Sequence, residues 1–248
     1  MRSTALLIAL SAVAFPTSAQ VYTQVTTYAG SGADGLSDGG LASAEFSTPY
    51  SLCYDGATNT IYVADAYNNC IRKITGGVVS TLAGNGTQGD VDAQGSNARF
   101  YLPTGIDFYN GFVYVSDNGN HKIKRIDASG NVSTIAGTGT AGTTNGPALS
   151  AKFYNPTEVR VSPAGVVFIS DYGNDCIRKL DAGVVSTFAG LPGSSGDMLG
   201  TGTAARFNRP TGIAFSNGID LLVADQVNCK IKKITPAGVV TLVAGSGA

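Results

Sequence analysis

The chain has 248 residues, of which 33 are glycine, and 43% of its residues are apolar. This much glycine beside an ordinary apolar content excludes collagen, which needs Gly at every third position, and a disordered chain, which lacks bulky apolar residues. A formal net charge of −1 gives no basic footprint for nucleic acid or for an anionic membrane surface.

Residues 1–19 have the pattern of a secretory signal peptide. Arg2 precedes an apolar run from Ala5 to Phe15, and a small-x-small stretch ends at Ala19. The run is too short for a membrane anchor, which needs about twenty apolar residues. We therefore expect residues 20–248 to form the mature domain, secreted or, in a bacterium, periplasmic, without membrane insertion.

The rest of the chain is an internal repeat. An Ala-Gly pair recurs with glycine spacings of 54, 53, 53 and 55 residues, ending at Gly30, Gly84, Gly137, Gly190 and Gly245. Three other landmarks keep the same period: Phe46, Phe100, Phe153 and Phe207; Pro49, Pro103, Pro156 and Pro210; Asp65, Asp117, Asp171 and Asp225. The chain therefore holds four copies of one unit.

Each copy predicts four short strands. Runs of three to six β-branched and aromatic residues alternate with turns rich in Gly, Asn and Asp, and no segment has sustained helical spacing. Four antiparallel strands repeated at about fifty residues are typical of an all-β fold of the β-propeller type, in which neighbouring blades supply one another's core. We predict blades at about 46–84, 100–137, 153–190 and 207–245, with an extra strand at 25–29.

One segment of each copy resembles a known repeat. Residues 117–126 read Asp-Asn-Gly-Asn-His-Lys-Ile-Lys-Arg-Ile, and residues 65–74, 171–180 and 225–234 vary the same theme. This resembles the signature of NHL-repeat propellers, with Asp, then Asn-His, then an Ile-basic-basic-Ile strand. The resemblance spans roughly residues 25–245 and implies four NHL-like four-stranded blades. The absence of Trp argues against WD-repeat and kelch blades.

The sequence leaves the closure of the propeller open. The last copy already has its own fourth strand, so the strand at 25–29 is one too many. Residues 244–248 repeat the sequence of residues 29–33. The alternatives are a closed four-bladed ring, an open arc, and a piece of a larger propeller. In the last two, unclosed blade edges would seek partners, including other copies of the chain.

The four cysteines permit two disulfide staples between blades. Cys70 and Cys176 occupy the same place before the third strand, whereas Cys229 lies one residue earlier, which predicts a side chain on the opposite face. The candidate pairs are Cys176 with Cys229 and Cys70 with Cys229. A pair of Cys53 with Cys70 is disfavoured, and buried free thiols are an equal alternative.

The repeated charged residues are interpreted as structural. We expect the Asp that ends each second strand to accept backbone N–H bonds in the turn that follows. The basic pairs that recur in the third strands are interpreted as solvated strand positions: Arg72-Lys73, Lys124-Arg125, Arg178-Lys179 and Lys232-Lys233. Some NHL domains bind RNA through a positive face, but an acidic secreted chain disfavours nucleic acid as a partner.

Few residues suggest a metal or a modification. Asp90 and Asp92 begin a calcium-loop pattern, but Tyr101 stands where such a loop places Glu, so calcium is a weak candidate against a solvated loop, and no other cofactor is expected. His121 is the single histidine and cannot build the histidine-held zinc of the amidating lyase that resembles this fold. Asn85 and Asn131 begin glycosylation sequons if the source is eukaryotic.

Without a catalytic cluster, the sequence favours a secreted, non-catalytic propeller that binds or scaffolds a protein or a glycan. One alternative is a propeller hydrolase or lyase with calcium in the central channel. The other is a self-assembling extracellular structural protein.

Overall fold

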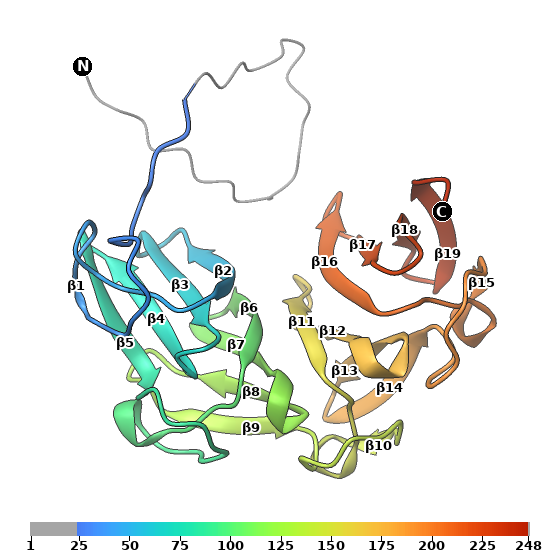
Figure 1. Cartoon of the computed structure of the whole chain (residues 1–248). Coiled ribbons are helices and arrows are strands. Elements are labelled where there is room, and N and C mark those ends of the chain that lie inside the picture. The colour runs from blue at the N-terminus through green and yellow to red at the C-terminus, as the bar shows by residue number, and fades with distance from the viewer. Residues whose placement is uncertain (1–23, 248) are drawn as a thin grey trace.

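The computed structural model describes residues 24–247, which form four antiparallel sheets arranged as the blades of an arc (Figure 1). The predicted signal peptide at 1–19 lies outside the described residues. Helical structure in the described part of the chain consists of short 3-10 turns. No helix there is both long and apolar enough to cross a membrane.

The strands follow the predicted repeat. Blade 1 contains β1 (Gly39–Gly40), β2 (Pro49–Asp55), β3 (Thr60–Asp65), β4 (Cys70–Thr75) and β5 (Val78–Gly84). Blade 2 contains β6 (Pro103–Tyr109), β7 (Phe112–Asp117), β8 (Lys122–Ile126) and β9 (Val132–Ala136). Blade 3 contains β10 (Gly146–Pro147), β11 (Pro156–Val161), β12 (Val167–Asp171), β13 (Cys176–Asp181) and β14 (Val184–Ala189). Blade 4 contains β15 (Gly200–Thr201), β16 (Pro210–Ser216), β17 (Asp220–Asp225), β18 (Lys230–Ile234) and β19 (Val239–Ala244).

Within each blade the four main strands follow chain order from the inside of the arc to the rim. In blades 1, 3 and 4 a two-residue strand from the preceding linker pairs with the outermost strand: β1 with β5, β10 with β14, and β15 with β19. A bulge recurs between the third and fourth strands, and its extra residue is Leu82, Ile135, Phe188 or Val243. The first three of these side chains pack against the cores between blades.

The hydrophobic core lies mainly between the blades. One cluster joins Ile71 and Ala83 of blade 1 to Ile106 of blade 2. Equivalent clusters join blade 2 to blade 3 and blade 3 to blade 4. A blade of this kind cannot bury both faces by itself, so each depends on its neighbours.

The four blades form an open arc. Successive innermost strands are in contact, β2 with β6, β6 with β11 and β11 with β16, but β2 and β16 lie apart at the two ends (Figure 1). Of the architectures left open by the sequence, the closed four-bladed ring is therefore wrong for this structure. At this curvature, four blades do not bring the first and the last together.

The extra strand expected at 25–29 is absent from the described structure. Residues 24–28 have no strand partner, and Val25 and Tyr28 are exposed. The physical reason is that the arc is open. Residues 24–28 precede blade 1, at the opposite end from blade 4, which already has its fourth strand in β19, so they have no blade to complete.

Candidate functional site

The aspartate that ends each second strand anchors a polar network inside its blade. One carboxylate oxygen accepts the backbone N–H of Ser47, Tyr101, Tyr154 or Asn208, at 2.7–2.8 Å. The other accepts the side-chain amide of Asn68, Asn120, Asn174 or Asn228. The prediction that these aspartates accept backbone N–H bonds is confirmed, but the backbone donor precedes the first strand, and the turn that follows contributes the asparagine side chain instead.

The basic pairs do not behave as predicted. The first member of each pair is fully buried, at 0% exposure: Arg72, Lys124, Arg178 and Lys232. The physical reason is that neighbouring strand residues point to opposite faces, so only the second member of the pair reaches the solvated side. The interpretation of both members as solvated positions is therefore wrong for the first.

Each buried cation has an anion and an aromatic ring beside it. The cation lies 2.7–3.6 Å from the strand-end aspartate of its own blade. It also lies 5.1–5.5 Å from the ring centroid of the repeated phenylalanine. Buried charges are tolerated when they are paired and hydrogen-bonded in this way. The landmarks Phe, Asp and basic residue are thus parts of one structural unit.

A residue from the preceding linker completes the network. Arg72 is 2.8 Å from Asp38, and Arg178 donates to the amide oxygen of Asn145 at 2.6 Å. Lys232 is 2.9 Å from Asp197. The linker therefore carries a matching acceptor in each of these three blades.

In blade 2 the linker residues are the two calcium candidates. Lys124 Nζ lies 2.9 Å from Asp90 and 3.0 Å from Asp92. Among residues 24–247 the structure contains no group of three or more His, Cys, Asp or Glu side chains that could hold a metal. The two carboxylates thus face an ammonium group of the protein, and calcium here stays an untested expectation.

Burial dominates the electrostatics of the network. It raises the pKa of Asp171 to about 6 and that of Asp117 to about 7, against the opposing attraction of Arg178 and Lys124. These aspartates are closed off from solvent and their hydrogen bonds are made within the blade. The four strand-end aspartates are therefore structural parts of the blades.

A second polar group, which sequence reasoning missed, ties two innermost strands together. Asp107 of β6 accepts the backbone N–H of Val161 in β11 at 2.7 Å. In return, Arg160 of β11 donates to the carbonyl oxygen of Ile106 at 2.6 Å. These bonds satisfy backbone groups at strand edges that no fifth strand covers.

Burial raises the pKa of two side chains in the same group. Glu158 accepts from Arg160 at 3.0 Å, and burial raises the pKa of Glu158 to about 7. Burial likewise raises the pKa of the Cys53 thiol, which keeps it neutral and unreactive. The sequence did carry a signal for Glu158, because this residue departs from the repeat. The other copies have Ser51, Gly105 and Gly212 at the same position.

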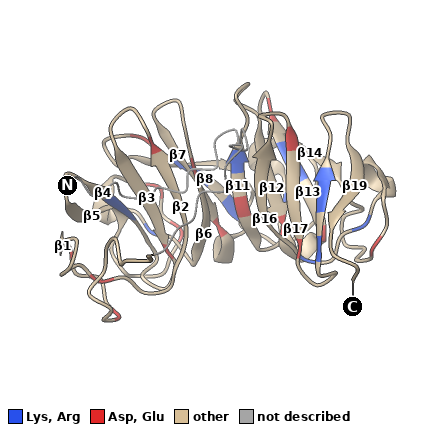
Figure 2. Ribbon diagram, turned by 90° about the horizontal axis from the view of Figure 1, so that it is seen from above, with Lys and Arg blue, Asp and Glu red and all other residues tan. Residues whose placement is uncertain are grey.

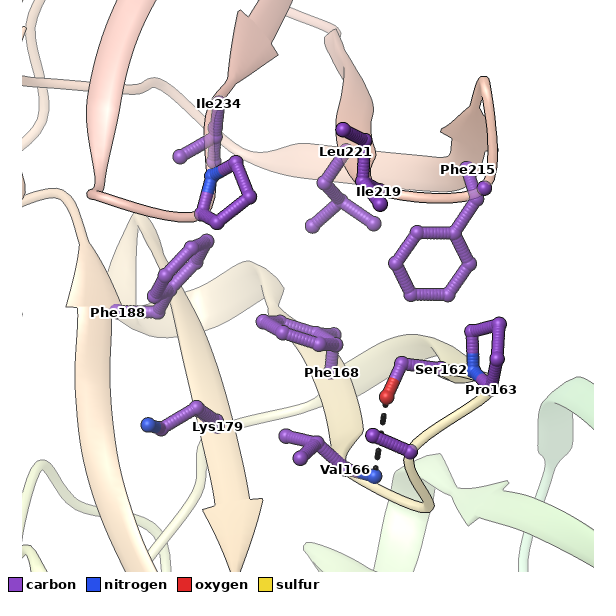
Figure 3. A pocket seen from close by; sticks show the side chains of 13 residues that line it. Ser162, Pro163, Val166, Phe168, Lys179, Phe188, Phe215, Ile219, Leu221 and Ile234 are labelled. Atoms are coloured by element: carbon purple, nitrogen blue, oxygen red, sulfur yellow. Dashed lines mark hydrogen bonds between the residues drawn. The ribbon is translucent and has the colours of Figure 1, made fainter.

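An apolar pocket lies between blades 3 and 4. It has a volume of about 370 Å³. Phe168 of β12 and Phe188, the bulge residue of β14, face Phe215 and Ile219 of blade 4 across it (Figure 3). The aliphatic stem and the ammonium of Lys179 border one side.

A difference between the copies of the repeat contributes to this space. Between blades 2 and 3, Tyr109 reaches across and donates its hydroxyl to the carbonyl oxygen of Pro163 at 3.0 Å. The equivalent residue of blade 3 is Ser162, which instead accepts the N–H of Val166 in its own hairpin (Figure 3). Tyrosine stands at this position in blade 2 alone, since blades 1, 3 and 4 have Asp55, Ser162 and Ser216, so no such ring reaches across between blades 3 and 4.

The comparisons with known proteins agree with the repeat. The NHL repeat profile matches residues 46–74. The chain is 31% identical over 239 residues to Protein SUPPRESSOR OF QUENCHING 1, chloroplastic, of Arabidopsis thaliana, covering 88% of this chain and 22% of that protein. It is 32% identical over 240 residues to NHL repeat-containing protein 2 of Bos taurus, covering 82% and 33% respectively.

The chain is an NHL-repeat propeller. It spans about a fifth to a third of the length of these relatives. Among solved structures, an auxiliary nutrient binding protein from Bacteroides ovatus superposes with a TM-score of 0.54 at 18% identity, over 90% of this chain and 64% of that one. A gluconolactonase-like protein gives a TM-score of 0.56 at 16% identity, over 88% and 69%. These structural likenesses show the fold.

The cysteines of this NHL propeller are free thiols. Cys70 and Cys176 are buried at the start of β4 and β13, whereas Cys229 is exposed in the turn before β18, with φ of 53°. The inference that Cys229 lies on the opposite face of a strand is therefore wrong, because its offset of one residue moves it into the turn. Neither predicted staple, Cys176–Cys229 or Cys70–Cys229, is formed in the structure.

The turn position of Cys229 has a recurring role in the other blades of the NHL propeller. There it accepts a backbone N–H from the residue before the repeated proline of the next blade. The pairs are Asn69 with Leu102 at 2.9 Å, His121 with Asn155 at 3.1 Å, and Asp175 with Arg209 at 2.8 Å. The single histidine thus joins two blades. Asn85 and Asn131 are exposed, and their glycosylation stays a prediction.

Proposed function

We propose that this NHL propeller is a binding module that receives an apolar side chain of a partner protein in the pocket between blades 3 and 4. The observation that carries the proposal is a cavity of about 370 Å³ walled by Phe168, Phe188 and Phe215. Pockets of this size, mostly apolar with a few polar groups, are the usual form of a ligand site.

The chemistry of the walls favours a protein over a glycan. Recognition of a sugar needs several hydrogen-bonding groups, but Ser162 is engaged within its own hairpin and the aromatic walls offer no polar atoms. Lys179, paired at 3.5 Å with the exposed Asp181, stands beside the pocket. An apolar residue next to an acidic one in the partner would match both features.

Two further features support a role in binding. Ile219 is 65% exposed on a hairpin of the pocket, as expected of a surface that a partner covers. The Bacteroides ovatus neighbour, a nutrient binding protein, suggests by analogy of fold that a binding role suits the architecture. The predicted signal peptide suggests that the partner is met outside the cytoplasm.

The test is selection of random displayed peptides on the chain without residues 1–19. We expect the enriched peptides to share a large apolar residue beside an acidic one. Ala164 lies on the pocket hairpin, so Ala164→Trp should fill the entrance and weaken binding of an enriched peptide by about tenfold or more.

The matched control is Ala57→Trp, on the corresponding hairpin of blade 1, which should leave binding unchanged. Lys179→Glu should also weaken binding, whereas Lys73→Glu at the equivalent position of blade 1 should not. Enriched peptides that bind Ala164→Trp as tightly as the unaltered chain would refute the proposal.

A further inference from the structure

The two ends of the arc expose apolar positions that the middle of the arc buries. We call the side of a blade that packs against the next blade its tail face, and the side that packs against the preceding blade its head face. Blade 4 thus has a free tail face, and the head face of blade 1, at the opposite end of the molecule, is free except where Ala29 and Gly30 of the same chain pack on it beside Phe46 (Figure 1 and Figure 2).

The three joints inside the chain are built alike. On each tail face an isoleucine of the third strand and an alanine of the fourth share a core cluster with one innermost-strand residue of the next head face. The sets are Ile71, Ala83 and Ile106; Ile123, Ala136 and Val159; Ile177, Ala189 and Ile213. All nine residues are 0–3% exposed.

On the free tail face of blade 4, only the tail-face side of such a joint is present. Ile231 and Ala244 occupy the isoleucine and alanine positions, but Ile231 is 38% exposed and Ala244 is also exposed. Both line a hollow of about 260 Å³, together with Ala224 and Cys229. The hollow stands where an innermost-strand residue of another head face would fit.

The free head face supplies the missing residue. Leu52 of β2 holds the position of Ile106, Val159 and Ile213, yet it is 56% exposed. The neighbouring Pro49 is exposed as well, whereas the equivalent prolines of the other blades are buried. Thr48, just before it, has the same left-handed backbone, with φ of 52°, as the residues that donate to the interblade turns.

We propose that the tail face of blade 4 binds the head face of blade 1 of a second copy of this chain, with Leu52 filling the hollow bounded by Ile231 and Ala244, and with Ala244-Gly245 of one copy taking the place of the identical Ala29-Gly30 of the other. The contact repeats a joint that the chain already makes three times. Thr48 of one copy then meets the turn of Cys229 in the other, as Leu102 meets Asn69.

The arrangement has a direction. Contact between two head faces would oppose Leu52 to Leu52, and contact between two tail faces would oppose two hollows, so only head against tail is complementary. Such a joint is heterologous, which means that two copies close into a ring or further copies extend the array. The alternative occupants, such as a different chain carrying similar blades, leave this protein alone monomeric.

Two variants test the joint, each in the chain without residues 1–19. Leu52→Asp disables the head face and Ile231→Asp the tail face, and both residues are exposed, so folding should survive. By sedimentation velocity over about a hundredfold concentration range, the unaltered chain should self-associate, and each variant alone should do so at least about tenfold more weakly. An equimolar mixture of the two variants retains one intact head and one intact tail, and should form a one-to-one complex.

The control is Leu149→Asp, since Leu149 is an exposed leucine of a linker and belongs to neither end face. It should associate like the unaltered chain. Circular dichroism checks that every variant has the same fold. An unaltered chain that stays monomeric would overturn the proposal, and so would an oligomer insensitive to both variants or a mixture of the two that remains monomeric.

Discussion

At the scale of single residues, two adjacent basic side chains of one strand lie in opposite environments. In the pair Arg72-Lys73 one side chain is sealed inside the blade and the next is half-buried at the surface. Pairing with Asp65 and Asp38 makes the sealed position tolerable. Removing either partner would leave a buried charge unpaired, which is among the more destabilising changes that a protein can suffer.

His121 gives a prediction of pH dependence. Its Nδ1 must be unprotonated to accept the N–H of Asn155, and burial lowers the pKa of the imidazole. A lowered pKa in the folded state means that the unfolded state binds more protons, so stability is full above the ordinary histidine pKa, about 6.5, and is lost as the pH falls below it.

In His121→Asn the amide oxygen should accept the same N–H, as Asn69 does in blade 1. We expect urea unfolding between about pH 5 and 8 to show a weaker loss of stability on acidification in His121→Asn than in the unaltered chain. Identical pH profiles for the two proteins would contradict this account.

At the scale of the element, linker and strand are matched. A glycine of each linker donates its N–H to the backbone carbonyl oxygen of the repeated phenylalanine, as Gly89, Gly142 and Gly196 do. Blades with a buried lysine place aspartate directly after that glycine, at Asp90 and Asp197, whereas blades with a buried arginine have Leu36 or Thr143 there and use the side-chain acceptor two residues further on. Lys124 pairs with that later position too, at Asp92, so the aspartate directly after the glycine is what distinguishes the lysine blades.

This matching predicts that Arg178→Lys destabilises the chain by about 1–3 kcal/mol, since an acceptor set arranged for a guanidinium loses its donors. Adding Thr143→Asp to Arg178→Lys should recover at least half of the loss, because it supplies the aspartate of the lysine-type blades. Urea unfolding of both variants and of Thr143→Asp alone measures this. If the second substitution brings no recovery, linker and cation are not matched in this way.

These elements show which features the sequence alone could predict. The period, the four blades and the turn role of Asp117 were predictable, because they depend on local patterns that recur. The burial of Lys124 was not, since its partners Asp90 and Asp92 stand more than thirty residues away in the chain. The pair Asp90 and Asp92 looked like a calcium loop because a sequence shows the anions but not which cation they meet.

The pocket could not be predicted from the sequence for a related reason. At Ser162 no ring reaches across as Tyr109 does between blades 2 and 3, and whether a space remains depends on the side chains of the next blade. The inner-strand group of Asp107 and Arg160 likewise joins two blades. Sites made between repeats become visible only when the repeats are packed.

At the scale of the whole molecule, the arc has unequal ends and a graded stability. In repeat proteins each unit is stabilised by its neighbours, so a terminal unit loses one interface. The tail strands β18 and β19 lack a following blade, whereas β13 and β14 have one.

We therefore expect amide hydrogens of β19 to exchange at least about tenfold faster than those of β14 in the monomeric Leu52→Asp variant. Hydrogen exchange followed by mass spectrometry at low protein concentration measures this. Equal protection of the two strands would mean that the blades unfold as one cooperative unit.

The position of each buried cation's partners has a consequence for how such a chain can grow. Asp38, Asp65 and Arg72 all fall within one repeat unit, and the same holds for Asp197, Asp225 and Lys232. A duplicated unit therefore contains both the buried cation and its acidic partners. Gain of a blade by gene duplication therefore leaves none of these buried cations unpaired.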